Sequence, residues 1–377
     1  MAPNEKTFAE FFAGIGLVGE GLRPSGWRCI YANDIDPKKH AMHTARHGEA
    51  EPFHLEDVGN TDAILEQMVG APFLATASFP CVDLSLAGHY RGFEGEHSST
   101  FFGFAQVLAA LGQRKPQVVL LENVVGFLTA RGGKDFMAAT QHLAELGYWL
   151  DVLLLDASHF VPQSRPRVFV VGVQEQLRPA SPGSLLADWN VELPHPLRPK
   201  PLLDLRLATR LPTDWVTLDI PAPPKRTITL SELIDQGDDQ DWWGETETAR
   251  HLAMLSERHR RALEAARTSG ETLVATAFRR MREKTMRLEI RFDGLAGCLR
   301  TPRGGSARQI VVVADRERIR IRWMSPREYA RLQGAPDFPL EGPATQMLFG
   351  FGDAVCVPAI RWIDEHVLTP LYEKVTG

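Results

Sequence analysis

Four residues of this sequence carry side chains suited to attack on an electron-poor ring. Cys81 follows a proline after a predicted buried strand, and Glu122 ends the next predicted strand. Arg165 and Arg167 are separated by one residue on a predicted extended segment, so we expect their side chains on one face. A thiolate can act as a nucleophile, a carboxyl group can hold or protonate a ring nitrogen, and guanidinium groups can hold carbonyl oxygens. Together the four suit attack on a pyrimidine, although a single cysteine also fits a core position and an arginine pair also fits surface ion pairs.

A glycine-rich turn and two acidic residues predict a nucleoside cofactor site beside these groups. The turn FFAGIG, residues 11–16, follows the first predicted strand, and its small residues let the backbone approach a ligand closely. Asp34, in the segment NDID, ends the second strand and can accept both hydroxyls of a ribose, and Asp57 can accept an adenine amino group. With Gly19 the turn also has the GxGxxG spacing of a dinucleotide site, so a nicotinamide-dependent oxidoreductase is an alternative.

The elements that must position these residues alternate between strands and helices in the first half of the chain. Strands are predicted at 7–12, 28–33, 72–79, 117–122, 150–155 and 168–173, with helices such as 101–111 and 135–146 between them. This alternation predicts an α/β fold with a mostly parallel, doubly wound sheet. Ligands of such sheets bind at the carboxyl ends of the strands, where most of the residues singled out above fall.

The second half of the chain predicts a smaller lobe. Residues 177–224 are rich in proline and leucine, which indicates a boundary followed by loop-rich structure. One amphipathic helix is predicted at 247–267, short strands at 309–313 and 318–323, and helices at 326–332 and 355–368. We therefore expect a cofactor-binding catalytic domain at 1–176, completed by a C-terminal helix at 345–377, and a second domain at 177–344.

Composition and charge narrow the classes of protein to consider. The chain has 377 residues, 44% hydrophobic, and a net charge of −5, but the segment 250–327 holds 19 basic and 8 acidic residues. An arginine-rich segment of this kind indicates a polyanionic partner or a solvated basic face. Four scattered cysteines without a CxxC pair favour a reduced, cytoplasmic protein without a structural metal, and no apolar run reaches the roughly 18 residues of a membrane span.

Read in chain order, these segments resemble the DNA cytosine-5 methyltransferase family of the bacterial type. FFAGIG is similar to its first cofactor motif, NDID to its ribose-binding acid, and FPCVDLSLAG to its Pro-Cys-Gln nucleophile loop. LLENVVGF matches its Glu-Asn-Val element and QSRPRVFVVG its Gln-x-Arg-x-Arg element. SPREYARLQGAPDF and FGFGDAVCVPAI resemble its last two motifs. The likeness covers residues 6–175 and 323–366, with Val82 in place of the loop glutamine and Asp353 in place of the final asparagine.

The resemblance implies an S-adenosylmethionine-dependent methyltransferase with a Rossmann-like sheet and a target recognition domain. Such an enzyme would methylate C5 of a flipped-out cytosine in a specific duplex DNA sequence and release S-adenosylhomocysteine, without a metal. Cys81 would add covalently to C6, Glu122 would hold N3 and the exocyclic amine, and Arg165 would bind O2 with support from Arg167.

The resemblance also implies two sets of binding residues. The expected cofactor-binding residues are Phe12, Ala13, Gly14, Ile15, Gly16, Asp34, Ile35, Asp57, Val58, Pro80, Asp353, Ala354 and Val355. The expected DNA-binding residues are Ser85, Gln163, Arg303, Gly304, Gly305, Arg308 and Gln309.

Three alternatives stay open beside this interpretation. The first is an RNA cytosine-5 methyltransferase on the same framework, the second a catalytically silent DNA-binding homologue, and the third the oxidoreductase named above. The expected partner is double-stranded DNA, with a cognate restriction endonuclease as a functional partner. We further expect a monomer that is located in the cytoplasm, is associated with the nucleoid and makes no contact with a membrane.

Overall fold

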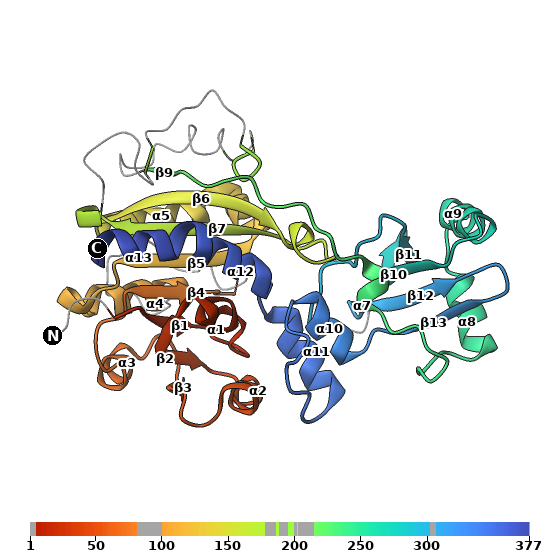
Figure 1. Ribbon diagram of the computed structural model, residues 1–377, viewed down its shortest axis with the longest axis horizontal. Helices are drawn as coiled ribbons and strands as arrows, with labels where there is room; N and C mark the ends of the chain where they lie inside the picture. The colour runs from red at the N-terminus through yellow and green to blue at the C-terminus, as the bar shows by residue number, and fades with distance from the viewer. Residues whose placement is uncertain are drawn as a thin grey trace. The chain divides into compact units, whose positions relative to one another are not determined.

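The computed structural model describes residues 5–80, 100–177, 186–187, 195–199, 202, 215–301 and 307–376. The chain divides into two compact units (Figure 1). The larger unit comprises residues 1–155, 166–223 and 359–377, and the smaller unit comprises 156–165 and 224–358. The sequence-based boundaries lay at 176 and 345; the difference arises because the loop before residue 166 and the helix at 344–353 make their contacts within the smaller unit.

The larger unit contains a seven-stranded sheet in the order β3-β2-β1-β4-β5-β7-β6. Its strands are β1 Thr7–Phe11, β2 Arg28–Asp34, β3 Phe53–Leu55, β4 Leu74–Ala77, β5 Val118–Val124, β6 Tyr148–Asp156 and β7 Pro166–Gln174. The pairs that join β3, β2, β1, β4 and β5 are parallel, and β7 runs antiparallel to β5. The predicted α/β fold with a mostly parallel sheet is therefore confirmed.

Helices cover this sheet, which explains why its central strands are buried along their whole length. All residues of β1 and β4 are buried, as expected for strands covered on both faces. The helices are α1 Leu17–Leu22, α2 Pro37–His47, α3 Thr61–Gln67, α4 Thr100–Ala110 and α5 Lys134–Glu145. One buried cluster joins the sheet to α3, α4 and α5; within it the rings of Phe11 and Phe104 lie 4.9 Å apart.

The C-terminal segment returns to the larger unit. It consists of α12 Val357–Ile363, a π-helical turn η8 Asp364–Leu368 and α13 Thr369–Thr376. Trp27 Nε1 donates a hydrogen bond of 2.7 Å to Asp364 Oδ1, and the ring of Tyr372 contacts Trp27 and Phe73 at 5.8 and 5.2 Å. These contacts hold the last helices against residues that directly precede β2 and β4.

The smaller unit is built on a four-stranded antiparallel sheet in the order β11-β10-β12-β13. The strands are β10 Leu273–Arg282, β11 Thr285–Arg291, β12 Ile310–Ala314 and β13 Ile319–Trp323. The helices are α7 Leu230–Leu233, α8 Glu245–Leu252, α9 Glu257–Thr268, α10 Pro326–Leu332 and α11 Ala344–Asp353. The strands predicted at 309–313 and 318–323 and the helix predicted at 326–332 are confirmed.

The single helix predicted at 247–267 is wrong, because the structure contains two helices there. α8 ends at Leu252, and Ser256 caps the start of α9 by accepting a hydrogen bond from His259 N at 3.3 Å. A serine at this position satisfies one of the unpaired N–H groups at the start of a helix, so a new helix can begin here. The spacing of apolar residues continues from α8 to α9, and the sequence pattern therefore does not reveal the break between them.

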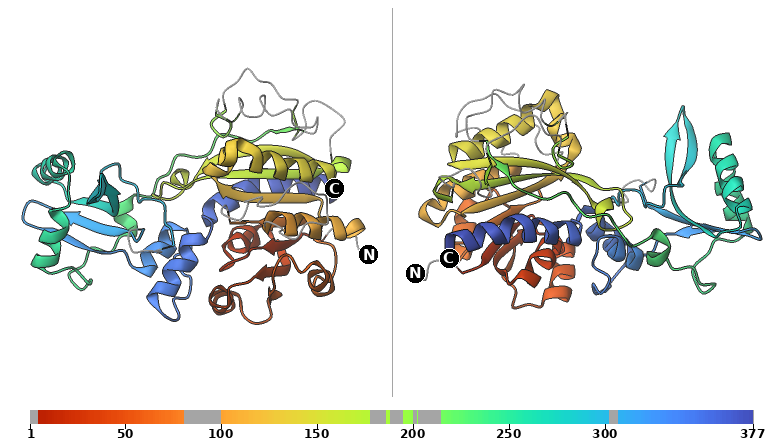
Figure 2. Two further views of the ribbon diagram at one scale, coloured as in Figure 1. Left: turned by 180° about the vertical axis from the view of Figure 1, so that it is seen from behind. Right: turned by 45° about the horizontal axis from the view of Figure 1, so that its top comes forward.

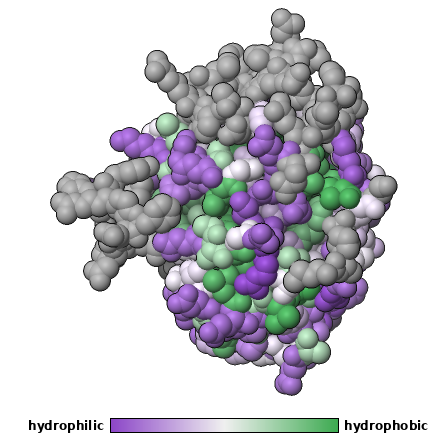
Figure 3. All heavy atoms as spheres, turned by 90° about the vertical axis from the view of Figure 1, so that its left-hand side faces the viewer, coloured by the Kyte–Doolittle hydropathy of each residue, from purple (hydrophilic) through white to green (hydrophobic). Residues whose placement is uncertain are grey.

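Apolar side chains on the surface lie among hydrophilic ones on the face drawn in Figure 3. Of the helices described, none combines the length and the apolar composition that crossing a membrane requires.

Candidate active site

The glycine-rich turn between β1 and α1 has a left-handed backbone at three alternate residues. Phe12, Gly14 and Gly16 have φ angles of 56°, 58° and 80°. The turn is tied to the end of β2, because Ala13 N donates to Asn33 O at 2.8 Å and Gly14 N donates to Asp34 Oδ2 at 3.0 Å. The predicted turn and the predicted acid are thus joined by a direct hydrogen bond.

Gly16 leaves no room for a side chain. A Cβ built on it would lie 2.6 Å from His47 Nε2 and 2.7 Å from His43 Cδ2. Both histidines come from α2, and burial lowers the pKa of each to about 3, so the rings are neutral at physiological pH. The turn is therefore packed closely on two uncharged rings, a contact that the sequence alone did not indicate.

The expected ribose and adenine contacts follow β2 and β3. Asp34 is almost fully buried, and its Oδ1 accepts a hydrogen bond from Asp36 N at 3.0 Å. Its two oxygens each keep a lone pair for a further donor, since each accepts one bond here. The side chain of Ile35 is 70% exposed, and an exposed apolar group beside the turn suits a flat heterocycle.

Asp57 and Val58 differ in exposure. Asp57 is exposed, and its Oδ1 accepts a hydrogen bond from Gly59 N at 2.8 Å. Val58 is buried under α4, so only its backbone could meet a ligand. Ile15 and Ala13 are buried as well, whereas Phe12 is partly exposed.

The chain that leads to Cys81 is anchored to the end of β5. Asn123 Nδ2 donates a hydrogen bond of 3.1 Å to Phe79 O, two residues before the cysteine. Pro80 is exposed. Cys81, Val82 and Ser85 themselves lie outside the described residues.

Glu122 forms an ion pair with Arg167. Arg167 Nε lies 2.8 Å from Glu122 Oε1, and the two side chains are only 13% and 11% exposed. The register of β5 with β7 brings them together, because Val124 pairs with Arg167. The antiparallel direction of β7 puts its first residues at the carboxyl ends of β1, β2, β4 and β5, which is the ligand-binding edge of such a sheet.

Arg165 has different surroundings, so the expectation that the two arginines point to one face is wrong. Its buried guanidinium donates to Leu299 O at 2.9 Å and to Ala354 O at 2.5 Å, all within the smaller unit. β7 begins only at Pro166, and the alternation of side chains does not extend to a residue before the strand.

Gln163 is fully buried, which corrects its prediction as a DNA contact. Its Oε1 accepts from Leu299 N at 3.2 Å, and its Nε2 donates to Leu332 O at 2.7 Å. Gln333, which sequence reasoning missed, is also fully buried and donates to Phe351 O at 2.6 Å and to Ala354 O at 3.1 Å. The two glutamines hold the smaller unit together around the segment with Ala354; in that segment Asp353 is exposed and Val355 is buried.

The expected DNA contacts near residue 305 are only partly described. Arg303, Gly304 and Gly305 lie outside the described residues. Gln309 is buried, so its prediction as a base contact is corrected, whereas Arg308 is partly exposed and stacks on Trp323 at 4.9 Å.

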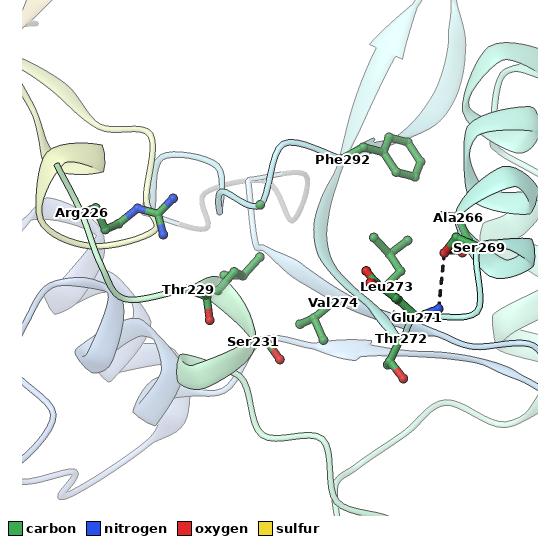
Figure 4. Close-up of a pocket in the computed structure, with 12 residues that line it drawn as sticks. Arg226, Thr229, Ser231, Ala266, Ser269, Glu271, Thr272, Leu273, Val274 and Phe292 are labelled. Atoms are coloured by element: carbon green, nitrogen blue, oxygen red, sulfur yellow. Dashed lines mark hydrogen bonds between the residues drawn. The ribbon is translucent and has the colours of Figure 1, made fainter.

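One pocket of about 430 Å³ lies in the smaller unit (Figure 4). Its lining includes Arg226, Thr229 and Phe292, and none of the residues predicted to bind a cofactor or to react. The described residues also contain no group of three or more His, Cys, Asp or Glu side chains that could hold a metal ion.

Comparison with known proteins adds to this geometry. A family model described as C-5 cytosine-specific DNA methylase matches residues 6–369. The chain is 26% identical to the Type II methyltransferase M.Bsp6I of Bacillus sp. (strain RFL6), over 95% of this chain and 97% of that protein. It is 25% identical to the Type II methyltransferase M.DsaV of Dactylococcopsis salina, over 98% and 88%. Among solved structures it is similar in fold to the S. pombe Dnmt2 methyltransferase, with a TM-score of 0.62 and 16% identity over 97% and 99% of the two chains.

Proposed function

The chain belongs to the C-5 cytosine-specific DNA methylase family, and from this premise we propose that it methylates C5 of a flipped-out cytosine in a specific duplex sequence through a covalent adduct of Cys81. The enzyme class, a DNA (cytosine-5-)-methyltransferase, follows from the family and from its Type II relatives. The proposal of a covalent mechanism depends on the ion pair of Glu122 with Arg167. The next residue, Asn123, anchors the chain just before Cys81.

The proposed chemistry starts from the low reactivity of cytosine C5. The Cys81 thiolate forms a bond from sulfur to C6, and the displaced ring electrons make C5 nucleophilic. When bound, S-adenosylmethionine would supply the methyl group that C5 takes up, and S-adenosylhomocysteine would be the leaving group. A base then removes the C5 proton, the ring double bond re-forms, and the thiolate leaves. Because C5 and C6 are stacked inside a duplex, the base must first leave the helix.

Glu122 and Arg167 are proposed to hold the base during these steps. One oxygen of the Glu122 carboxyl group can accept from the exocyclic amine, and the other, when protonated, can donate to N3, while the Arg167 guanidinium reaches O2. Arg167 suits the O2 contact better than Arg165, because Arg167 is beside Glu122 whereas Arg165 is committed to backbone carbonyl groups. Arg165 is then a positioning residue for the smaller unit.

The residues of the glycine-rich turn fit S-adenosylmethionine. Gly14, which is partly exposed, and Gly16 have positive φ angles, and Gly16 has no space for a Cβ. Asp34 would accept the ribose hydroxyls, Ile35 would contact the adenine ring, and Asp57 would accept from its amino group. Asp353, Ala354 and Val355 belong to the smaller unit, and their contact with the cofactor stays a prediction.

The biological setting is proposed from the relatives. The Type II relatives suggest that this chain protects DNA beside a restriction endonuclease with the same recognition sequence. We infer a monomer acting on the nucleoid in the cytoplasm.

A cysteine exchange tests the proposal directly. Cys81→Ser is expected to abolish both methyl transfer to plasmid DNA and covalent trapping by a duplex that contains 5-fluorocytosine. Cys29→Ser is the matched control, because Cys29 is buried in β2 and its thiol donates a hydrogen bond to Tyr31 O. Activity and trapping should therefore persist in this variant. Normal turnover by Cys81→Ser would overturn the mechanism.

A further inference from the structure

The β10–β11 hairpin extends beyond the rest of its sheet. β10 pairs with β11 along its length up to Arg282, opposite Thr285, but it pairs with β12 only from Leu273 to Ala277. Residues 278–289 therefore form a two-stranded arm, which projects past the other strands in the right-hand view of Figure 2.

The arm is held in one register by its turn and by an ion pair. Glu283 and Lys284 form a two-residue connection, and both have positive φ angles, 46° and 63°, which matches the tight turn that hairpin twist favours. Arg282 Nε lies 2.8 Å from Glu289 Oε1. With its register fixed, the arm has two distinct faces.

One face of the arm brings two arginines together. Arg280 pairs directly with Arg287 across the two strands, whereas Met281 pairs with Met286 on the opposite face. Like charges directly opposite each other destabilise a strand pair. Within the part of the chain that the structure describes, neither guanidinium group forms a hydrogen bond or an ion pair, and Glu289, the acid on this face, is paired with Arg282.

Several other arginines of the smaller unit do have a carboxylate partner: Arg250, Arg261, Arg267, Arg291, Arg318, Arg320, Arg322 and Arg331. Segment 278–289 has five basic and two acidic residues, and its tip is exposed. Arg280 and Arg287 thus form a local site for an anion, and no carboxylate of the described chain occupies it.

We propose that the β10–β11 arm binds the phosphate backbone of the substrate duplex through Arg280 and Arg287. Guanidinium groups suit phosphate oxygens, and a two-stranded ribbon has a width that the major groove of B-DNA admits. The proposal rests on the proposed function for its choice of duplex DNA as the anion. Backbone contacts carry no base sequence, so the arm contributes affinity and orientation to every duplex equally.

The test compares DNA binding by wild type and by the Arg280→Gln/Arg287→Gln double variant, using fluorescence anisotropy of a duplex of arbitrary sequence. Each lost phosphate contact lowers the slope of log Kd against log salt by roughly 0.9, so we expect a decrease of roughly 1.8. Arg280→Lys/Arg287→Lys should retain most of the slope. Arg258→Gln is the matched control, because Arg258 is an exposed arginine on α9 and should leave the slope unchanged.

The thermal midpoint separates this role from a structural one. Removing two opposed charges should leave the Tm of the free protein unchanged or raise it. If Arg280 and Arg287 instead stabilised the fold, their exchange would lower the Tm. The proposal would be overturned if the double variant kept the salt slope of wild type, had a lower Tm, or lost no more slope than Arg258→Gln. It would also be overturned if wild type lost more affinity for tRNA than for duplex DNA when the two arginines are exchanged. The binding assay does not depend on methyl transfer. If wild type binds DNA through the arm but never methylates it, the proposed function is overturned and the proposal for the arm is not.

Discussion

Gly16 offers a sharp test of how the cofactor turn is built, through the substitution Gly16→Ala. The new Cβ would lie 2.6 Å from His47 Nε2 and 2.7 Å from His43 Cδ2, and it would sit on a backbone with a φ of 80°. Gly26 is a matched control, because its φ of 84° is nearly the same and no atom lies within 4 Å of its Cβ position. The pair of variants separates backbone strain from steric overlap.

The expected magnitudes follow from these two contributions. A left-handed backbone costs an alanine about 1–2 kcal/mol, which the lower entropy of the unfolded chain offsets by about 0.4–1 kcal/mol. Gly26→Ala should therefore lose about 1 kcal/mol. Overpacking adds about 1–3 kcal/mol, so Gly16→Ala should lose about 2–4 kcal/mol. Distortion of the turn should also weaken S-adenosylmethionine binding by at least about tenfold, which corresponds to about 1.4 kcal/mol.

Urea unfolding monitored by circular dichroism gives the stability of each variant, and calorimetric titration gives the Kd for S-adenosylmethionine. His47→Ala removes the nearest ring atom, so the Gly16→Ala/His47→Ala double variant should lose less stability than the sum of the two single losses. Equal losses for Gly16→Ala and Gly26→Ala, or full additivity in the double variant, would refute the packing argument.

Two further predictions concern buried charge in the larger unit. Burial raises the pKa of Glu10 from 4.5 to about 8, so the folded protein keeps a proton that the unfolded chain releases, and stability falls as the pH rises through this window. Glu10→Gln should remove that fall, so by pH 8 its free energy of unfolding should exceed that of wild type by at most about 5 kcal/mol. Unfolding titrations from pH 5 to 9 measure this difference, and parallel curves for the two proteins would contradict the prediction. Arg198→Ala should cost about 3–5 kcal/mol in urea unfolding, because it removes the cation of the ion pair from the fully buried Asp151 carboxylate. The exposed pair of Arg261 with Glu257 is its control, and Arg261→Ala should cost less than about 1 kcal/mol; similar losses would count against the burial argument.

The sequence predicted the strands of the larger unit well, because most of them are short apolar runs between turns. The predicted strand at 28–33, for example, corresponds to β2 Arg28–Asp34, and the predicted turn and acid that follow β1 and β2 are joined by the bond from Gly14 N to Asp34 Oδ2. Strand order and the antiparallel direction of β7 depend on long-range pairing, which local periodicity does not contain.

Burial of polar side chains was the main limit at the site. Gln163 and Gln309 were predicted to contact DNA from their residue types, but both are buried, since an amide can satisfy backbone groups as well as base edges. The proposed function exchanges the roles expected for Arg165 and Arg167 for a related reason. Their spacing suggested one face, whereas the start of β7 at Pro166 separates their partners.

Bisulfite sequencing of plasmid DNA from cells that express the chain is the most direct test of cytosine methylation in duplex DNA. We expect cytosines at one position of one short sequence to resist conversion in wild-type cells, and none to resist it in cells that express Cys81→Ser. Complete conversion of the plasmid in wild-type cells, together with methylation of tRNA, would contradict it.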